Sequence, residues 1–435
     1  MILLTKNRKA ILLSTITNNI ARILGWTTSI YVSVSIIEHL GEGEFARFAV
    51  VLSFAGLGSI LDLGAGTSFA EFSGKKAPND GATFQGQLLG HAWGRLTSSL
   101  LLFFAITTVA LLVSKRCLPQ AIDYKIAASA FACFMITGIS QYAALAQRLY
   151  AIQLKDYKSN LIAVLANIVS ALLVANLVKW KAFSGEYLAV GMTCLSATIL
   201  IGATFIGLKN NILPQTKSEP NRDDSSSQDL KRAFNLFGYK ITLITISGII
   251  GGALDTVLVC RFISLEDAAR HSLGYRIFLG VALAQLSINQ LWPIVSKKWA
   301  SGGKHEQRRV IRMLYAASLA VGLSVSAIAV FSVTKGQELL ALKWATFSSS
   351  ELLAFSILST SAGLGGISML LCGRESMLTG IVALNIGFCL ISLPVKYWMS
   401  LRGGLAGFLW GAALARILAY DIPVFLFLRS KMQRI

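Results

Sequence analysis

Twelve apolar stretches, each of roughly 20 to 27 residues, follow one another along the chain. A bilayer core about 30 Å thick takes about 20 helical residues to cross. The pattern therefore predicts an all-α membrane protein of about 12 transmembrane helices, in two six-helix lobes around a central cavity. The predicted spans are 11–37, 45–70, 88–113, 125–147, 159–178, 187–208, 234–260, 267–294, 310–332, 350–373, 377–395 and 404–428.

Composition agrees with a membrane protein. Hydrophobic residues make up 54% of the chain and charged residues 14%, against about 25% charged residues in soluble domains. The formal charge of +19 would suggest nucleic acid as the partner of a soluble protein. Here most Lys and Arg residues lie between predicted spans, where they set orientation, so we expect no nucleic-acid partner.

The basic residues between spans are divided unevenly. The gaps on the side of the two termini carry about twice as many Lys and Arg as the opposite gaps, in which we place Arg270, Lys396 and Arg402. By the positive-inside rule both termini are cytoplasmic. The first stretch, Ile11 to Ile37, lacks a cleavage site after it and is interpreted as an uncleaved span.

A polar segment divides the spans into six and six. It contains PQTKSEPNRDDSSSQDLKR, whose Pro, Ser, Asp and Lys content is typical of a flexible linker. We therefore predict an N-terminal lobe at 1–208, a cytoplasmic linker at 209–233 and a C-terminal lobe at 234–435. The halves are weakly similar, since an acidic loop precedes the second helix of each, GEGEFARF at 41–48 and SLEDAARHSLGYRIF at 264–278. Such a duplication favours a binding site between two lobes.

The charges inside the spans are the candidate functional residues. An arginine at the centre of a span costs about 2.5–3.5 kcal/mol, so it normally faces a partner or a wet cavity. Arg22 lies near the middle of the first span and shares a polar stripe with Asn18, Ser29 and Ser33, with Asn19 adjacent. Asn and Ser alone would suit hydrogen bonding between helices. The full positive charge of Arg22 favours a cavity.

Asp255 and Arg276 lie on the seventh and eighth spans. Two interpretations stay open: the two residues neutralise each other, or Asp255 is a carboxylate that responds to protons or a cation during transport. Arg416, in the last span, is a further candidate for the cavity. We expect Asp421 to be a poor partner for Arg416, because an offset of five residues does not stack on one helical face.

Two other features of the spans have structural interpretations. Asp62, in LDLGAG, pairs with a basic residue or caps an interrupted helix, although it is also a candidate for ion coupling. The glycines Gly403, Gly407 and Gly411 form a GxxxGxxxG pattern that is typical of close helix packing.

Catalytic and metal-binding patterns are absent from the sequence. The chain has no GxxxxGK[ST], HExxH or GxSxG motif, and its histidines and cysteines are scattered. We therefore expect no enzyme, no metal and no cofactor. The candidate cavity carries positive charge, and arginine suits phosphate and carboxylate oxygens, so an anionic substrate is expected.

Three segments are similar to one known family. HLGEGEFARFAVVLSFAGLGSILDLGAGTSF at 39–69 resembles the second-helix region of Wzx-type O-antigen and polysaccharide flippases of the MOP superfamily, a group that also holds the MATE transporters. ALDTVLVCRFISLEDAARHSLGYRIF at 253–278 is similar to that family's helix 7 to helix 8 segment. RGGLAGFLWGAALARILAY at 402–420 is similar to its glycine-rich last helix.

This resemblance implies a function. It implies flipping of an undecaprenyl-pyrophosphate-linked oligosaccharide, an O-antigen or other lipopolysaccharide repeat unit, from the cytoplasmic to the periplasmic leaflet of the bacterial inner membrane. On this basis Arg22, Arg276 and Arg416, with Asn18 and Asn19, hold the substrate, and Asp255 and Asp62 couple transport to protons or sodium. Membrane lipids and the polysaccharide polymerase machinery are the implied partners.

Other functions stay open. A cation-coupled multidrug exporter of the same superfamily would need acidic groups for cationic drugs, whereas the first span has an arginine and no carboxylate. A non-transporting scaffold of a glycan-assembly complex would tolerate loss of the arginines. A peptidoglycan-precursor flippase usually has fourteen spans.

Overall fold

The computed structural model describes residues 2–73, 88–105, 124–152, 156–211, 224–288, 304–339, 346–372 and 375–434. These residues are almost entirely helical and contain no strand, so the predicted all-α class is confirmed. The linker residues 212–223 and the outer part of the third predicted span lie outside them. Contacts divide the chain into two compact units, Met1–Ile246 and Ser247–Ile435.

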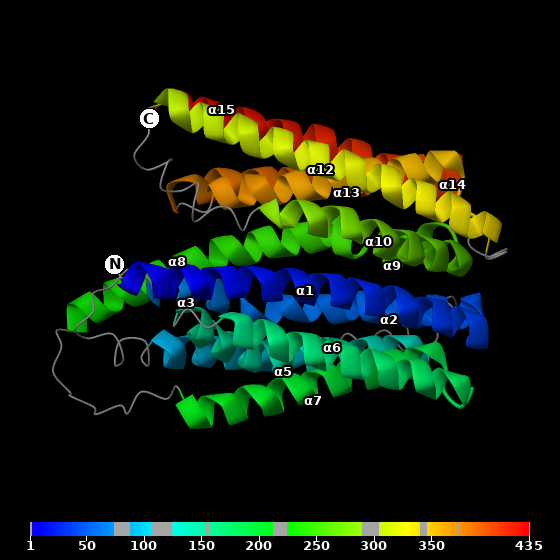
Figure 1. The fold of residues 1–435 in the computed structure, drawn as a ribbon, viewed down its shortest axis with the longest axis horizontal. Helices are drawn as coiled ribbons and strands as arrows, with labels where there is room; N and C mark the ends of the chain where they lie inside the picture. The colour runs from blue at the N-terminus through cyan, green and yellow to red at the C-terminus, as the bar shows by residue number, and fades with distance from the viewer. Residues whose placement is uncertain are drawn as a thin grey trace. The chain divides into compact units, whose positions relative to one another are not determined.

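The first unit is built from α1 (Ile2–Leu40), α2 (Glu42–Leu57), α3 (Ala65–Ser73), α5 (Tyr124–Ile152), α6 (Asp156–Lys179), α7 (Gly185–Asn211) and most of α8 (Asp224–Gly248). Helix α1 packs on α6, and α5 packs between α2 and α7 (Figure 1). Part of the core is a cluster of Leu61, Leu96, Leu100 and Phe134. These residues come from the second to fourth predicted spans, which therefore pack together.

The second predicted span is interrupted. A 3₁₀ helix, Gly58–Asp62, follows α2, and Leu63 and Gly64 take positive φ angles of 44° and 69° before α3 begins. Gly64 also lies against the backbone of Gly238, where a Cβ atom on residue 64 would stand 2.5 Å from the Gly238 carbonyl oxygen. The LDLGAG sequence therefore turns the chain and lets α3 approach α8.

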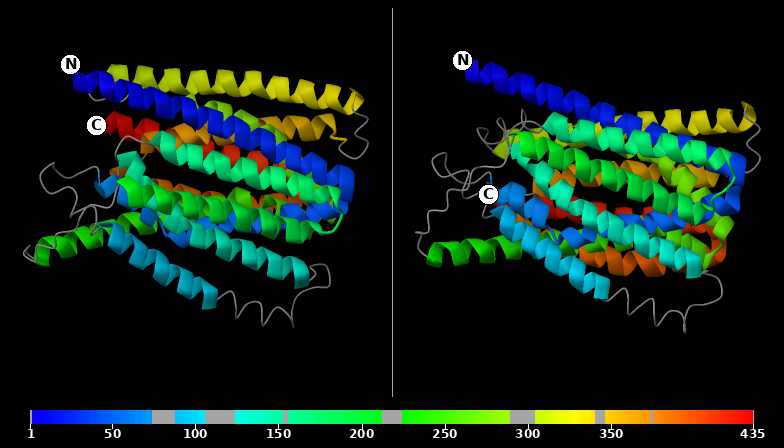
Figure 2. Two further views of the ribbon diagram at one scale, coloured as in Figure 1. Left: turned by 60° about the horizontal axis from the view of Figure 1, so that its bottom comes forward. Right: turned by 90° about the horizontal axis from the view of Figure 1, so that it is seen from below.

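The second unit is built from a π-helix (Ile249–Ala253), α9 (Asp255–Phe262), α10 (Leu265–Leu286), α12 (Lys304–Leu339), α13 (Ser349–Cys372), α14 (Glu375–Arg416), a second π-helix (Ile417–Asp421) and α15 (Ile422–Arg434). Helix α13 contacts α10, α12 and α14, so it is central to the unit. Figure 2 shows α12, in yellow, as one unbroken helix.

Helix α14 joins the last two predicted spans across a kink. Gly403 and Gly404 are non-helical there, and Gly404 has a φ angle of 53° that favours glycine. A Cβ atom on Gly407 would collide with the Met399 carbonyl, and one on Gly411 would lie 3.1 Å from the Lys396 Cα atom. Gly407 and Gly411 thus serve close packing, as predicted, whereas Gly403 has open space around it and belongs to the turn.

Eight helices or merged helices among the described residues are long and apolar enough to cross a membrane. Their outward faces are apolar, since Ile23 on α1 is 60% exposed and Phe331 on α12 is 66% exposed. Hydrocarbon rather than water suits such faces. The chain is therefore a multi-pass membrane protein.

Candidate substrate and coupling residues

Arg22 lies on α1 and is half-buried. Its Nη1 atom is buried and has no hydrogen-bond partner within the described part of the chain. Asn18 and Asn19 are also half-buried, whereas the Ser33 hydroxyl donates to the Ser29 carbonyl at 2.7 Å. The outer part of the predicted stripe is thus satisfied within its own helix, and Arg22 keeps an unused donor.

Asp255 opens α9 and is buried. Its Oδ1 atom lies 2.6 Å from Nζ of Lys396, which is completely buried on α14. Of the two open interpretations, mutual neutralisation of Asp255 and Arg276 is wrong, because Lys396 is the ion-pair partner of this carboxylate. Arg276 lies on α10 and is half-buried.

The placement of Lys396 and Arg270 between spans is also wrong. Helix α14 continues through Pro394, so Lys396 lies inside the helix, two residues beyond that proline. Arg270 lies in the second turn of α10, which begins at Leu265. A proline lacks only its own N–H donor, and a helix can continue past it at the expense of a kink.

Arg416 and Asp421 form an ion pair, with 3.6 Å between Arg416 Nε and Asp421 Oδ1. The prediction that Asp421 is a poor partner was therefore wrong. Residues Ile417–Asp421 form a π-helix, in which the N–H of Ile422 donates to the Ile417 carbonyl five residues earlier. A wider turn places residues five apart on one face, which the α-helical spacing excludes.

Aromatic rings surround this arginine. The guanidinium carbon of Arg416 lies 4.6 Å from the Tyr420 ring centroid and 5.7 Å from that of Phe388. Ser361 on α13 donates a hydrogen bond to Asp421 Oδ2. Arg416 Nε is buried and has no hydrogen-bond partner among the described residues, so the ion pair leaves part of its donor capacity unused.

Phe388 connects the two charged centres of this unit. Its ring packs on Tyr420, with 5.8 Å between centroids, and Gly251 lies so close to the ring that a Cβ atom there would collide with it. Gly251 belongs to the π-helix that precedes Asp255. The Asp255–Lys396 pair and the Arg416–Asp421 pair are therefore packed against opposite sides of one aromatic neighbour.

Asp62 is a helix cap. Its Oδ1 and Oδ2 atoms accept from the backbone N–H of Gly66 at 2.9 and 3.0 Å, in the first turn of α3. This is the capping of an interrupted helix that the sequence predicted as one alternative. Its coupling role stays a prediction.

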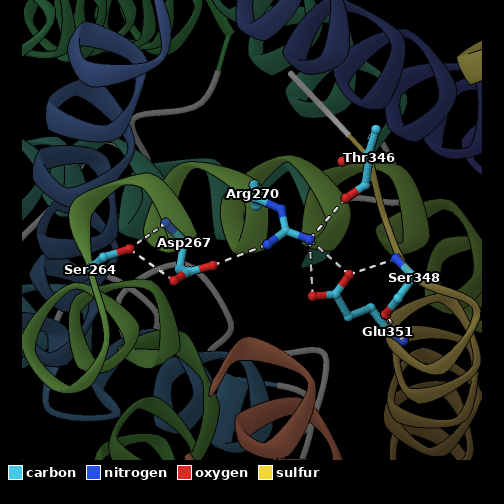
Figure 3. A network of polar contacts seen from close by, with 6 residues as sticks. All are labelled: Ser264, Asp267, Arg270, Thr346, Ser348 and Glu351. Atoms are coloured by element: carbon cyan, nitrogen blue, oxygen red, sulfur yellow. Dashed lines mark hydrogen bonds and ion pairs between the residues drawn. The ribbon is translucent and has the colours of Figure 1, made fainter. Parts of the chain in front are cut away.

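A polar network ties the beginnings of α10 and α13 together (Figure 3). Ser264 and Asp267 form one capping box, and Ser348 and Glu351 form another, with backbone-to-hydroxyl distances of 2.9 and 3.2 Å. Arg270 joins them, because its Nη1 atom lies 3.1 Å from Asp267 Oδ1 and its Nη2 atom 2.8 Å from Glu351 Oε2. The network fixes this end of the second unit.

The first unit has a comparable arrangement. Glu44 pairs with Arg47 at 3.2 Å, with the same three-residue offset as Asp267 and Arg270, and accepts from the N–H of Gly185 at the beginning of α7. The acidic loops identified in the sequence thus do the same work in both units. The sequence analysis missed Glu351, although the S-x-x-E pattern at 348–351 was a signal for it.

Comparison with known proteins gives the fold. No protein-family profile and no curated protein matches the chain. Among solved structures, the Vibrio cholerae MATE transporter VcmN is 13% identical with a TM-score of 0.65, covering 99% of this chain and 98% of that one.

Two further MATE structures agree. An outward-facing multidrug resistance MATE family transporter of the MOP superfamily is 13% identical with a TM-score of 0.63, covering 98% of this chain and 96% of that one. The MATE multidrug transporter DinF-BH, in complex with a drug ligand, is 13% identical with a TM-score of 0.55, covering 97% of this chain and 96% of that one. The chain therefore has the fold of MATE transporters, which have about 12 transmembrane helices.

Proposed function

We propose that this chain is a flippase that moves undecaprenyl-pyrophosphate-linked oligosaccharide, such as an O-antigen repeat unit, from the cytoplasmic to the periplasmic leaflet by alternating access. The observation that carries the proposal is the unused, buried guanidinium donor of Arg22 on α1. A buried donor without an acceptor is unfavourable by about 1–3 kcal/mol, and more for a charged group. A phosphate oxygen of a substrate would supply that acceptor.

Asn18 and Asn19 lie within about one turn of Arg22 and would add neutral hydrogen bonds to the same anionic group or its sugars. On the second unit, Arg416 and Arg276 are the matching cations. Arg416 has an unused Nε donor and a carboxylate neighbour that a phosphate would displace. The proposed process is transport without covalent chemistry, in the bacterial inner membrane with both termini cytoplasmic.

Coupling to an ion is part of the proposal. Asp255 and Asp62 are the candidate carboxylates, and protons or sodium the candidate ions. Asp255 is the stronger candidate, since Asp62 already caps α3 through both of its oxygens. Protonation of Asp255 would break its ion pair with Lys396.

A multidrug exporter is the second candidate function. The fold favours it, because MATE structures with this fold include multidrug transporters, one of them in complex with a drug ligand. The charges oppose it: the buried carboxylate available to a cationic drug in the second unit, Asp255, is already paired with Lys396. A scaffold in a glycan-assembly complex is a third function, and it would need none of these charges.

The test is deletion of the gene followed by measurement of surface polysaccharide and of the leaflet in which lipid-linked repeat units accumulate. We expect polymer to be lost and repeat units to be trapped on the cytoplasmic side. Arg22→Ala should fail to restore polymer, Arg22→Lys should restore part of it, and Arg309→Ala, at an exposed position on α12, should restore it fully. Unchanged polymer in the deletion strain would exclude the flippase. Repeat units already facing the periplasm would indicate a later role.

A further inference from the structure

The ammonium group of Lys396 is held like a bound cation. Its Nζ atom lies 2.5 Å from the Gly251 carbonyl oxygen and 2.6 Å from Asp255 Oδ1. The Phe408 ring centroid lies 5.8 Å from the same nitrogen. Lys396 is completely buried, so the described protein groups around it replace its hydration.

The π-helix supplies one of these oxygen atoms. Between Ile249 and Ala253 the hydrogen bonds run five residues back, as shown by the N–H of Leu254 donating to the Ile249 carbonyl at 3.0 Å. This change of register frees backbone carbonyl groups from their usual N–H partners. The Gly251 carbonyl accepts from Lys396 instead, and the Ser392 hydroxyl lies 3.5 Å from the same oxygen.

We propose that Gly251, Asp255 and Phe408 form a monovalent cation site of the primary-ammonium class, and that Lys396 is its tethered occupant. A carboxylate, a carbonyl oxygen and an aromatic face are the groups that attract a small ammonium ion. The π-helix and α9 contribute the two oxygens, and α14 contributes both the occupant and the ring. Asp255 therefore has its cation built into the chain.

The site differs from an ordinary stabilising ion pair. A buried ion pair often stabilises a protein no more than apolar residues of the same volume. A structural pair also needs no local π-helix to expose a carbonyl. The nearby titratable group His271 is not a ligand of the ammonium, since its Nδ1 atom contacts the Thr256 hydroxyl at 3.1 Å and its ring packs against Phe408.

The experiment is thermal unfolding of purified protein in detergent, with ethylammonium chloride as the probe and choline chloride at the same ionic strength as the reference. Lys396→Ala keeps the helix and leaves a void beside Asp255. We expect its Tm to rise by about 3–6 °C at about 50 mM ethylammonium, because a ligand stabilises the folded state that binds it. Lys396→Met fills the void with an uncharged chain and should not respond.

Two further variants locate the site. In Asp255→Asn combined with Lys396→Ala, the rise should disappear. A folded Lys396→Ala protein without any rise, or an equal rise in the double variant, would overturn the proposal.

The wild-type protein gives an arm that does not depend on any variant folding. Its Tm should change by less than about 1 °C when choline is replaced by sodium, potassium or ethylammonium, because Lys396 occupies the site. A saturable sodium-dependent rise that is lost in Asp255→Asn would show that an external ion, not Lys396, is the occupant. None of these measurements uses a transport substrate, so failure of the flippase proposal leaves them intact.

Discussion

Arg416 Nε lies 3.6 Å from Asp421 Oδ1, although five residues separate them in the last span. The π-helix between them brings the two side chains to the same face. Asp421 is in turn held by the Ser361 hydroxyl on α13. The arginine of the second unit thus has a resident anion, with which an anionic substrate must compete.

That competition predicts opposite effects of two substitutions. Asp421→Asn removes the competing charge and should raise the affinity for a short-chain prenyl pyrophosphate by about three- to tenfold, the scale of a partly exposed ion pair. Arg416→Gln should lower it. Binding is measured by the shift in Tm with ligand concentration. A parallel loss of affinity in both variants would mean that the pair is needed intact, and that Arg416 does not hold the phosphate.

The network around Arg270 predicts a difference between two arginines in similar local sequences. Arg270 contacts Asp267 on its own helix and Glu351 on α13, whereas Arg47 forms an ion pair with Glu44 on its own helix. Arg270→Met should destabilise the protein by about 1–2 kcal/mol, reduced by partial exposure, and Arg47→Met by less than about 0.5 kcal/mol. Thermal unfolding measures both. Equal losses would show that the tie between α10 and α13 contributes nothing.

Hydropathy predicted the helices well, because a bilayer demands long apolar stretches whatever their neighbours. The structure places helices over all the predicted spans that it describes, and the polar LDLGAG and RGG segments mark real interruptions. Capping boxes were readable too. The pattern S-x-x-D/E at 264–267 and 348–351 needs only local hydrogen bonds to act.

The charged pairs were harder to predict, and for physical reasons. The Arg416–Asp421 pair depends on one extra residue in a turn, which no spacing rule for α-helices contains. The Asp255–Lys396 pair joins residues 141 positions apart, and hydropathy ends a span at a lysine even where the helix continues. Burial of a charge is decided by its partner, and a single sequence does not show the partner.

Gln285 at the centre of the second unit predicts a packing defect. It is completely buried and donates to the carbonyls of Ser318 and Thr360 at 3.0 and 3.1 Å. A Cβ atom on Gly363 would collide with its side chain, so Gly363→Ala should destabilise the protein by about 1–3 kcal/mol. Gly387→Ala is the matched control, since that Cβ atom would meet open space. Thermal unfolding should separate the two, and similar Tm values would contradict the described packing.

Asp62 allows a test that separates a cap from a coupling carboxylate. Both of its oxygens accept from the Gly66 N–H, and an asparagine keeps one such oxygen while losing the charge. If Asp62 acts as a cap, Asp62→Asn should retain wild-type stability within about 0.5 kcal/mol and restore polymer to the deletion strain. Asp62→Ala should lose about 1 kcal/mol, because the first turn of α3 then has an unsatisfied donor.

The two readouts of these Asp62 variants distinguish the roles. Stability is measured by thermal unfolding and transport by surface polysaccharide. A cap predicts that both quantities fall together in Asp62→Ala and neither falls in Asp62→Asn. A coupling carboxylate predicts that Asp62→Asn remains stable but loses transport as completely as Asp62→Ala, because coupling needs the charge whereas capping needs only an acceptor oxygen. Since both oxygens of Asp62 are already used by α3, we expect the first result.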